Sequence, residues 1–145
     1  AHVVPCYEVF TGARKAHLVL GLCAGGTLLE RVCAPDEPHA TALLLSDAGA
    51  ARVARQVLEA IRFLHHHGVV HRDVKLENLL LRDPLDASSS VDDVHVVLVD
   101  FGSARYLRTR QLGERKPTAH VGTLAYMAPE QHVGGTVDAS LDLWS

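Results

Sequence analysis

The sequence predicts an α+β fold, because strand patterns and helix patterns occupy separate parts of the chain. Two short apolar runs separated by a polar turn lie near the start, and one long amphipathic segment follows them. Two more apolar runs, residues 79–81 and 94–99, are typical of short buried strands. Both of these later runs adjoin acidic and amide side chains that can carry out chemistry.

The first 23 residues predict a β-hairpin. Its first strand combines residues 3–4 with residues 7–10, and its second strand is residues 17–23, HLVLGLC. Residues 11–15 between them have the composition of a turn.

The next segment predicts a short helix and a loop. Residues 24–26, Ala-Gly-Gly, end the strand, and residues 27–32 are suited to a short helix. Residues 34–40 contain two prolines and predict a loop.

A long helix is expected after Ser46 and Asp47, which are suitable caps for its start. Gly68 is suited to end the helix, because glycine readily adopts a positive φ. The apolar face of this helix repeats at helical spacing and comprises Val53, Val57, Ile61 and Leu64. The side chains expected away from that face are polar: Arg52, Arg55, Gln56, Glu59 and Arg62.

The composition fits one compact unit or a piece of a larger one, since 48% of the 145 residues are hydrophobic. The net charge of -3 gives no reason to expect attraction to nucleic acid or to a membrane surface. No apolar run is long enough to span a bilayer. Cys6, Cys23 and Cys33 form no CxxC pair, and their odd number favours a reducing compartment. We therefore expect an intracellular, cytoplasmic protein.

Residues 71–81, HRDVKLENLLL, bring together an acid, a cation and a carboxamide. They predict a loop that presents Asp73, Lys75 and Asn78 to one small volume before the chain re-enters the core. Asp73 is placed to accept a proton from an attacking hydroxyl group or to orient it. Lys75 is placed to neutralise charge on a transferred phosphoryl group.

A second acidic position, Asp100, follows the apolar run of residues 94–99. Gly102 allows the backbone to turn sharply there. The Asp100 carboxylate and the Asn78 amide oxygen are hard donors of the kind that Mg²⁺ prefers. Phosphoryl transfer requires mainly positioning and charge neutralisation, so these side chains predict a site for a metal-bound phosphate chain. The simpler alternative is ordinary capping and turn chemistry.

Five short motifs occur in a fixed order along the chain, and on them the chain resembles the eukaryotic protein kinase family. They are His71-Arg72-Asp73, Asn78, Asp100-Phe101-Gly102, Ala128-Pro129-Glu130 and Asp142-Leu143-Trp144. The resemblance implies a partial kinase fold. Residues 1–23 would form the end of the small lobe and the hinge, and residues 24–145 would belong to the large lobe.

The resemblance implies a role for each matching residue of the catalytic loop, residues 71–78, and of the activation segment, residues 100–130. Asp73 would be the catalytic base, assisted by Lys75 and Thr123. Asn78 and Asp100 would bind Mg²⁺. By the same resemblance, His71 and Phe101 would be packing residues, and Asp142 would bond to the backbone of the catalytic loop.

The resemblance also implies an ATP site. Leu20 would lie at the back of the nucleotide pocket, and the backbones of Gly21 and Cys23 would face the edge of the adenine. Leu80 would pack beneath the ring. Lys75, Asn78 and Asp100 would contact the phosphates and their metal.

Lys75 and the segment of residues 122–126, GTLAY, resemble the serine/threonine-specific branch of the family. The implied function is transfer of the γ-phosphoryl group of ATP to a serine or threonine of a protein substrate. Residues 24–32, AGGTLLERV, are most similar to the calmodulin-dependent-kinase-like group. Arg72 resembles the arginine that binds a phosphate in the activation segment, and Thr118, with Thr109 behind it, is the expected acceptor.

Several elements of the family have no counterpart in these residues: the Gly-rich phosphate loop, the strand lysine with its glutamate partner, and the arginine that pairs with Glu130. Thr27 also stands where many relatives carry an acid near the ribose. We therefore expect a truncated domain, unstable or inactive in isolation. The open alternative is a non-catalytic kinase-like fragment or pseudokinase that binds or regulates a partner.

Two other clusters are expected to have no special chemistry. Residues 65–67, three histidines, together with His71 suggest a metal site, but successive helical residues point in different directions, so helix capping is expected instead. The basic run of residues 105–116 predicts a solvated loop rather than a nucleic-acid surface.

Overall fold

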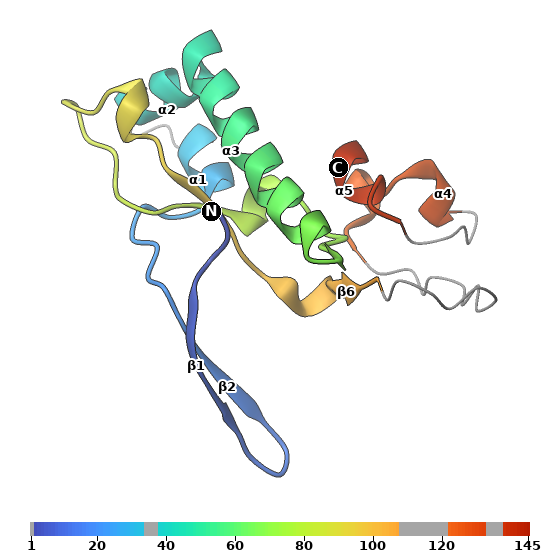
Figure 1. Cartoon of the computed structure of the whole chain (residues 1–145). Coiled ribbons are helices and arrows are strands. Elements are labelled where there is room, and N and C mark those ends of the chain that lie inside the picture. Colours follow the sequence, from blue (N-terminus) through green and yellow to red (C-terminus); the bar gives the residue numbers. More distant parts are fainter. Residues whose placement is uncertain (1, 34–37, 108–121, 133–137) are drawn as a thin grey trace.

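The computed structural model describes residues 2–33, 38–107, 122–132 and 138–145 (Figure 1). Its helices and strands together confirm the predicted α+β class, a partial protein-kinase-like fold. The strands are β1 (Cys6–Thr11), β2 (Ala16–Leu20), β3 (Val69–Val70), β4 (Leu79–Leu81), β5 (Val96–Leu98) and β6 (Arg105–Tyr106). The helices are α1 (Leu28–Val32), α2 (Pro38–Leu45), α3 (Asp47–His66), α4 (Pro129–His132) and α5 (Leu141–Trp144).

The strands of the described ranges form three antiparallel pairs, β1 with β2, β3 with β6 and β4 with β5. The β1–β2 hairpin projects away from the helices, and every residue of its two strands is exposed (Figure 1). The hairpin was predicted, although β2 ends at Leu20 instead of residue 23.

The prediction that residues 3–4 belong to the first hairpin strand is wrong. Val3 instead forms a parallel bridge with Leu98 of β5, and the Val4 amide donates to the Leu98 carbonyl at 3.0 Å. The physical reason is Pro5, which has no N–H to continue a ladder. The Pro5 carbonyl accepts a hydrogen bond from the Gly21 amide at 2.9 Å, which ties this bend to the end of β2.

The short helix α1 forms as predicted, with a reciprocal cap between Thr27 and Glu30. The predicted loop of residues 34–40 is wrong in its last part, because α2 begins at Pro38. Proline suits the first turn of a helix, where its missing N–H would have no partner in any case. Residues 34–37 lie outside the described ranges.

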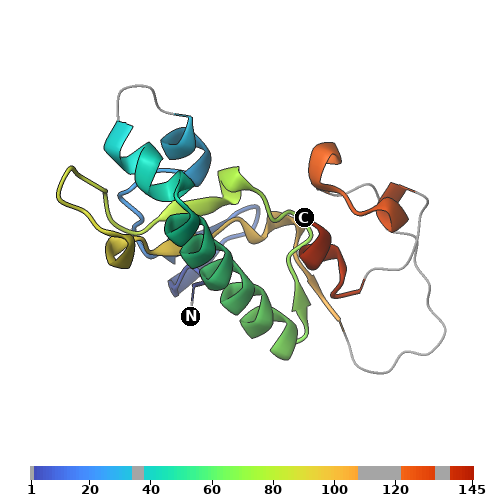
Figure 2. The same ribbon diagram turned by 90° about the horizontal axis from the view of Figure 1, so that it is seen from above.

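The long helix α3 begins and ends where the sequence predicts. The Ser46 hydroxyl accepts a hydrogen bond from the Gly49 amide at 3.1 Å, and Gly68 follows the helix with a φ of 72°. Figure 2 shows α3 running across the central strands, with α5 close to its carboxyl-terminal end. The main core cluster comprises Leu28, Ala40, Leu44, Ala60, Leu64, Leu79, Leu81, Leu85, Val94, Val96 and Leu98.

Gln56 corrects the predicted polar face of α3, because only 4% of its surface is exposed. Its side-chain NH₂ donates to the Val94 carbonyl at 2.7 Å, and its side-chain oxygen accepts from the Val96 amide at 2.6 Å. Gln56 therefore acts as a neighbouring strand would act at the start of β5. Because Gln56 and Arg52 both donate to the Val94 carbonyl, β5 begins at Val96 and not at residue 94 as predicted.

Strands β4 and β5 adjoin the two segments that contain the predicted site residues. Leu79 pairs with Leu98, so Asn78 just before β4 lies beside Val99 just after β5. The Val99 amide donates to the Asn78 carbonyl at 3.0 Å and extends the pairing by one step. Within the described residues, no helix combines the length and the hydrophobicity that crossing a bilayer requires.

The buried Leu81 provides a test of this core. Leu81→Ala should lower the free energy of unfolding by about 2–5 kcal/mol, because Leu81 is fully buried and its truncation leaves a cavity. Leu22→Ala is the matched control, since Leu22 is 85% exposed. Urea unfolding of both variants measures the difference, and equal losses would contradict the placement of Leu81 in the core.

Candidate active site

The catalytic loop, residues 71–78, runs between β3 and β4. This loop and the segment after β5 each contain one non-glycine residue with a positive φ. Arg72 and Asp100 are the non-glycine residues of the described ranges with a positive φ, 68° and 59°. Such conformations cost of order 1–3 kcal/mol and persist where surrounding contacts enforce them. Arg72 directly precedes Asp73, and Asp100 is itself a predicted Mg²⁺ ligand.

Asp73 is the centre of the site, and 9% of its surface is exposed. One carboxylate oxygen accepts from the amide and the hydroxyl of Thr123, at 3.0 and 2.9 Å. The other pairs with the Lys75 ammonium at 2.9 Å and accepts from the Asn78 side-chain NH₂ at 3.1 Å. Lys75, Asn78 and Thr123 therefore all contact the Asp73 carboxylate, although Thr123 lies fifty positions away in the chain.

The surroundings of Asp73 hold it ionised. Burial alone would raise the pKa of Asp73, but the hydrogen bonds and charge of Lys75 and the hydrogen bonds of Thr123 outweigh it and lower the pKa. The pKa of Lys75 is raised in turn, first by its hydrogen bond to Asp73. Because the pKa of Asp73 is lowered on folding, the ionised carboxylate stabilises the fold above its ordinary value of about 3.9. That contribution is lost as the pH falls through the pKa of the folded state.

Lys75 and Thr123 are joined directly, since the ammonium donates to the Thr123 hydroxyl at 2.6 Å. The charge of Asp100 also contributes to the raised pKa of Lys75. Asp100 therefore lies close enough to the catalytic loop to act on the same cation. Asp73, Lys75 and Asn78 are thus in direct contact, whereas Asp100 is linked to them through its charge alone.

Asn78 and Asp100 offer oxygen atoms that suit Mg²⁺. The Asn78 NH₂ group donates to the carbonyl and the carboxylate of Asp73, which leaves its side-chain oxygen as the acceptor. One oxygen of the Asp100 carboxylate accepts from the Gly102 amide at 3.1 Å. One carboxylate and one carboxamide are hard donors that leave positions open for phosphate oxygens and water. The donor set therefore fits the ion.

His71 and Phe101 link the two active segments, as predicted. Their ring centroids are 5.0 Å apart with an interplanar angle of 71°. The His71 ring, through Nε2, contacts the Val99 carbonyl at 2.9 Å, and the Arg72 guanidinium donates to the Ser103 carbonyl at 2.6 Å. The catalytic loop is therefore bonded to the backbone on both sides of Asp100.

Asp142 bonds to the backbone of the catalytic loop, which confirms that prediction. Its two carboxylate oxygens accept from the His71 amide at 2.8 Å and the Arg72 amide at 2.7 Å. The side chain also contacts His65 at the end of α3. The sequence predicted only helix capping for His65, because the spacing of three consecutive histidines does not distinguish the one that points inward.

The remaining histidines of α3 have local contacts. His67, directly after α3, contacts the Phe63 carbonyl at 2.8 Å, and its ring lies tilted against the Phe63 ring. In the described part of the chain, no three His, Cys, Asp or Glu side chains group closely enough to hold a metal ion.

Gly21 and Cys23, the predicted adenine-edge residues, follow β2, which ends at Leu20. Leu20 is 44% exposed, and the Gly21 amide is occupied by Pro5. Among the described residues, neither the Gly21 carbonyl nor the Cys23 amide has a hydrogen-bond partner. Burial raises the pKa of the Cys23 thiol, so this side chain stays protonated near neutral pH.

Leu80 bridges to Thr27 across the same region of the structure. The amide of Gly25 donates to the Leu81 carbonyl, and the Leu81 amide donates to the Gly26 carbonyl. These bonds hold the segment after β2 against β4. Residues 25–27 therefore lie beside the backbone of Leu80 and Leu81.

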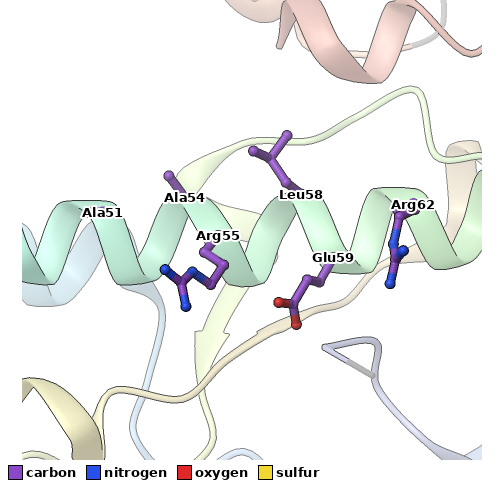
Figure 3. Close-up of a pocket in the computed structure, with 6 residues that line it drawn as sticks. All are labelled: Ala51, Ala54, Arg55, Leu58, Glu59 and Arg62. Atoms are coloured by element: carbon purple, nitrogen blue, oxygen red, sulfur yellow. The ribbon is translucent and has the colours of Figure 1, made fainter.

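The predicted phosphate acceptors are not part of the described structure. Thr118 and Thr109 lie outside the described residues, as do residues 108–121 as a whole. A separate hollow on the exposed side of α3 is lined by Ala51, Ala54, Arg55, Leu58, Glu59 and Arg62 (Figure 3). It contains no residue of the candidate active site.

The fold and the contacts around Asp73 define a protein kinase catalytic segment, and comparison with known proteins agrees. The profile of the family described as "Protein kinase domain" matches residues 1–145. The chain therefore belongs to the protein kinase family, and its relatives are serine/threonine kinases.

Three relatives illustrate the range of similarity. Human serine/threonine-protein kinase ULK1 and calcium/calmodulin-dependent protein kinase cmkB of Emericella nidulans are each 32% identical over 144 residues, 99% of this chain. Calcium-dependent protein kinase 8 of Oryza sativa subsp. japonica is 35% identical over 147 residues, also 99% of this chain. The chain spans 13%, 32% and 23% of their respective lengths. Calcium/calmodulin-dependent kinases are among the relatives, but ULK1 is equally identical, so identity does not select one group.

Lys75 provides a test of the electrostatics. Lys75→Met should raise the pKa of Asp73, because burial still opposes ionisation while the ammonium that favours it is gone. The pKa is measured by ¹³C NMR titration of the Asp73 carboxyl group. Arg82→Met is the control, since Arg82 pairs with the exposed Asp83 and should leave Asp73 unchanged. An unchanged pKa in Lys75→Met would show that the ion pair does not form in solution.

Proposed function

We propose that this chain is the catalytic part of a serine/threonine protein kinase that transfers the γ-phosphoryl group of ATP to a protein hydroxyl group. The observation that carries this proposal is the set of contacts on Asp73. One buried carboxylate with a lowered pKa contacts Lys75, Asn78 and Thr123.

Asp73 is the proposed catalytic base. An ionised carboxylate accepts a hydrogen bond from a substrate serine or threonine hydroxyl and orients it for attack on the γ-phosphorus. Thr123 and Lys75 fix the direction of this carboxylate through both of its oxygens. The Lys75 ammonium lies 2.9 Å from the carboxylate, so it is also placed to neutralise charge on the transferred group.

Asn78 and Asp100 are the proposed Mg²⁺ ligands. Mg²⁺ supplies shielding of the phosphate charge when it is bound. The bond from the Val99 amide to the Asn78 carbonyl sets the spacing between the two residues, so their donor atoms are held by the β4–β5 pair. The hydrogen bonds from Asn78 to Asp73 support a metal ligand beside the proposed base.

The proposed adenine site is the segment after β2. The Gly21 carbonyl and the Cys23 amide offer one acceptor and one donor, which matches the edge of an adenine. Leu20 and Leu80 offer apolar surface for the ring. This arrangement divides the chain into residues 1–23, the end of the small lobe and hinge, and residues 24–145, the large-lobe portion.

Control by phosphorylation is part of the proposal. Burial, and then the neighbouring charge of Arg105, lower the pKa of Arg72, so two guanidinium groups lie near each other. A phosphate on Thr118 in the activation segment, residues 100–130, would relieve this repulsion. The proposed partners are ATP and a protein substrate, with no nucleic acid. Three free cysteines support an intracellular, cytoplasmic location.

Asp73→Asn tests the proposed base. The amide keeps the shape of the side chain but cannot accept a proton, so phosphate transfer should fall about 10²–10⁴-fold. Transfer of labelled γ-phosphate to a serine/threonine peptide is measured on the full-length protein, with ATP affinity as a second readout that should change little. Asp86→Asn, in the exposed loop after β4, is the control and should retain activity. Binding of ATP without transfer in the unsubstituted protein would instead favour the non-catalytic module.

Asp100→Asn tests the proposed metal site. Loss of the carboxylate charge should raise the Mg²⁺ concentration needed for half-maximal ATP binding, because the remaining donors are neutral. Titration with Mg²⁺ at fixed ATP measures this shift. Asp92→Asn is the matched control, since Asp92 pairs with Arg52 on the surface. Equal Mg²⁺ dependence in the unsubstituted and Asp100→Asn proteins would remove Asp100 from the ligand set.

A further inference from the structure

The segment that leads into β1 is attached to β5 through its backbone. The Leu98 amide donates to the His2 carbonyl at 2.9 Å, and the Val4 amide donates to the Leu98 carbonyl at 3.0 Å. These two bonds flank Val3, which forms the parallel bridge with Leu98. Residues 2–4 therefore lie beside β5 as a third strand, on the edge opposite to β4.

The His2 side chain adds two further contacts, one to β5 and one to α3. Its Nδ1 lies 2.9 Å from the Val96 carbonyl oxygen. Its Nε2 lies 3.5 Å from a carboxylate oxygen of Glu59, in the second half of α3. The His2 side chain is 24% exposed and the Glu59 side chain is 50% exposed. A single imidazole ring thus joins three elements: the segment before β1, strand β5 and helix α3.

Both ring nitrogens of His2 face oxygen atoms that accept hydrogen bonds and donate none. A carbonyl oxygen and an ionised carboxylate carry no proton. A neutral imidazole has one N–H group, so it can donate to only one of these two partners, and its bare nitrogen then faces the other oxygen. An imidazolium has two N–H groups and a charge opposite to that of Glu59, so it satisfies both contacts. Protonation therefore changes one bond into two at this junction.

Three other charged or titratable side chains line hollows of α3 together with Glu59. Arg55 and Arg62 lie on the same side of the helix as Glu59 (Figure 3). Both guanidinium groups stay charged throughout the range in which histidine titrates, so their effect on Glu59 does not vary with pH. His66 lines a second hollow with Glu59 and can titrate in that range. Strand β5 contributes a backbone carbonyl, which carries no titratable charge. Among the described residues, Glu59 forms its ion pair with His2.

We propose that His2 is a pH-sensitive link, which holds residues 2–4 against β5 and α3 more tightly when its imidazole is protonated. The bond to Glu59 is present at acidic pH and is lost as the pH rises through the range of about pH 5–8 in which imidazoles titrate. Strand β5 is followed by Asp100, so the link acts on the strand that leads to this residue. The proposal concerns the attachment of the segment and does not require phosphate transfer.

The Leu98 amide reports on this attachment, because it donates to the carbonyl of His2. The Val99 amide is the internal reference, since it donates to the Asn78 carbonyl beside β4. Hydrogen exchange of both amides is measured by NMR on the full chain at about pH 5.5 and about pH 7.5, on either side of the imidazole titration. Each rate is converted to a protection factor with the intrinsic rate at that pH. We expect the protection of Leu98 relative to Val99 to be about two- to fivefold higher at the lower pH.

Glu59→Gln tests the partner of His2. The amide keeps the size of the side chain but removes its charge, so the relative protection of Leu98 should become equal at the two pH values. His66→Gln is the matched control, because it removes the other titratable group beside Glu59 and should leave the pH dependence unchanged. The proposal is overturned by equal relative protection at both pH values in the unsubstituted chain. It is also overturned if the pH dependence persists in Glu59→Gln or disappears in His66→Gln.

The protonation of the His2 ring provides a second readout, which needs no substitution. The ¹⁵N chemical shifts of the two ring nitrogens distinguish a nitrogen that carries a proton from one that does not. In the neutral ring we expect the proton on Nδ1, which lies closer to its acceptor than Nε2 does. In the acidic form we expect both nitrogens to be protonated. A neutral ring with its proton on Nε2 would retain the bond to Glu59 at high pH, and this result would also overturn the proposal.

Discussion

The carboxylate of Asp142 joins three parts of the chain that lie far apart in the sequence. It connects the end of α3 through His65, the catalytic loop through the amides of His71 and Arg72, and α5, which carries it. Since the Asp142 side chain is fully buried, none of these bonds is weakened by competing water. The Arg72 amide is one of these donors, so the positive φ of Arg72 is held in part by Asp142.

The ionisation of the Asp73 carboxyl group depends on a balance between burial and neighbouring donors. Its own burial disfavours the charge, and the cation and donors around it restore the charge. The result is an acceptor that is dehydrated, ionised and fixed in direction, which are the properties that a base for a neutral hydroxyl needs. The same Lys75 that pairs with Asp73 also experiences the charge of Asp100, so the base and the proposed metal site share one electrostatic environment.

The sequence predicted those features that depend on local pattern and missed those that depend on tertiary pairing. The start and end of α3 follow from Ser46 and Gly68, and strand β4 and the buried run around β5 follow from their apolar residues. Val3 was misplaced because Pro5 breaks the ladder and a distant strand accepts the segment. Gln56 looked like a surface residue by helical period, yet two bonds to the backbone near β5 account for its burial. The proposed site residues come from the order of the motifs, whereas the burial of His65 follows from its tertiary contact with Asp142.

The β1–β2 hairpin has a consequence for how the chain behaves in solution. Its residues Tyr7, Phe10 and Leu18 are more than half exposed, and no other described strand pairs with either edge. A ribbon of two strands gains little stability by itself, and open edges with apolar side chains recruit further strands. These exposed edges therefore offer a surface on which copies of the chain can associate through added strands.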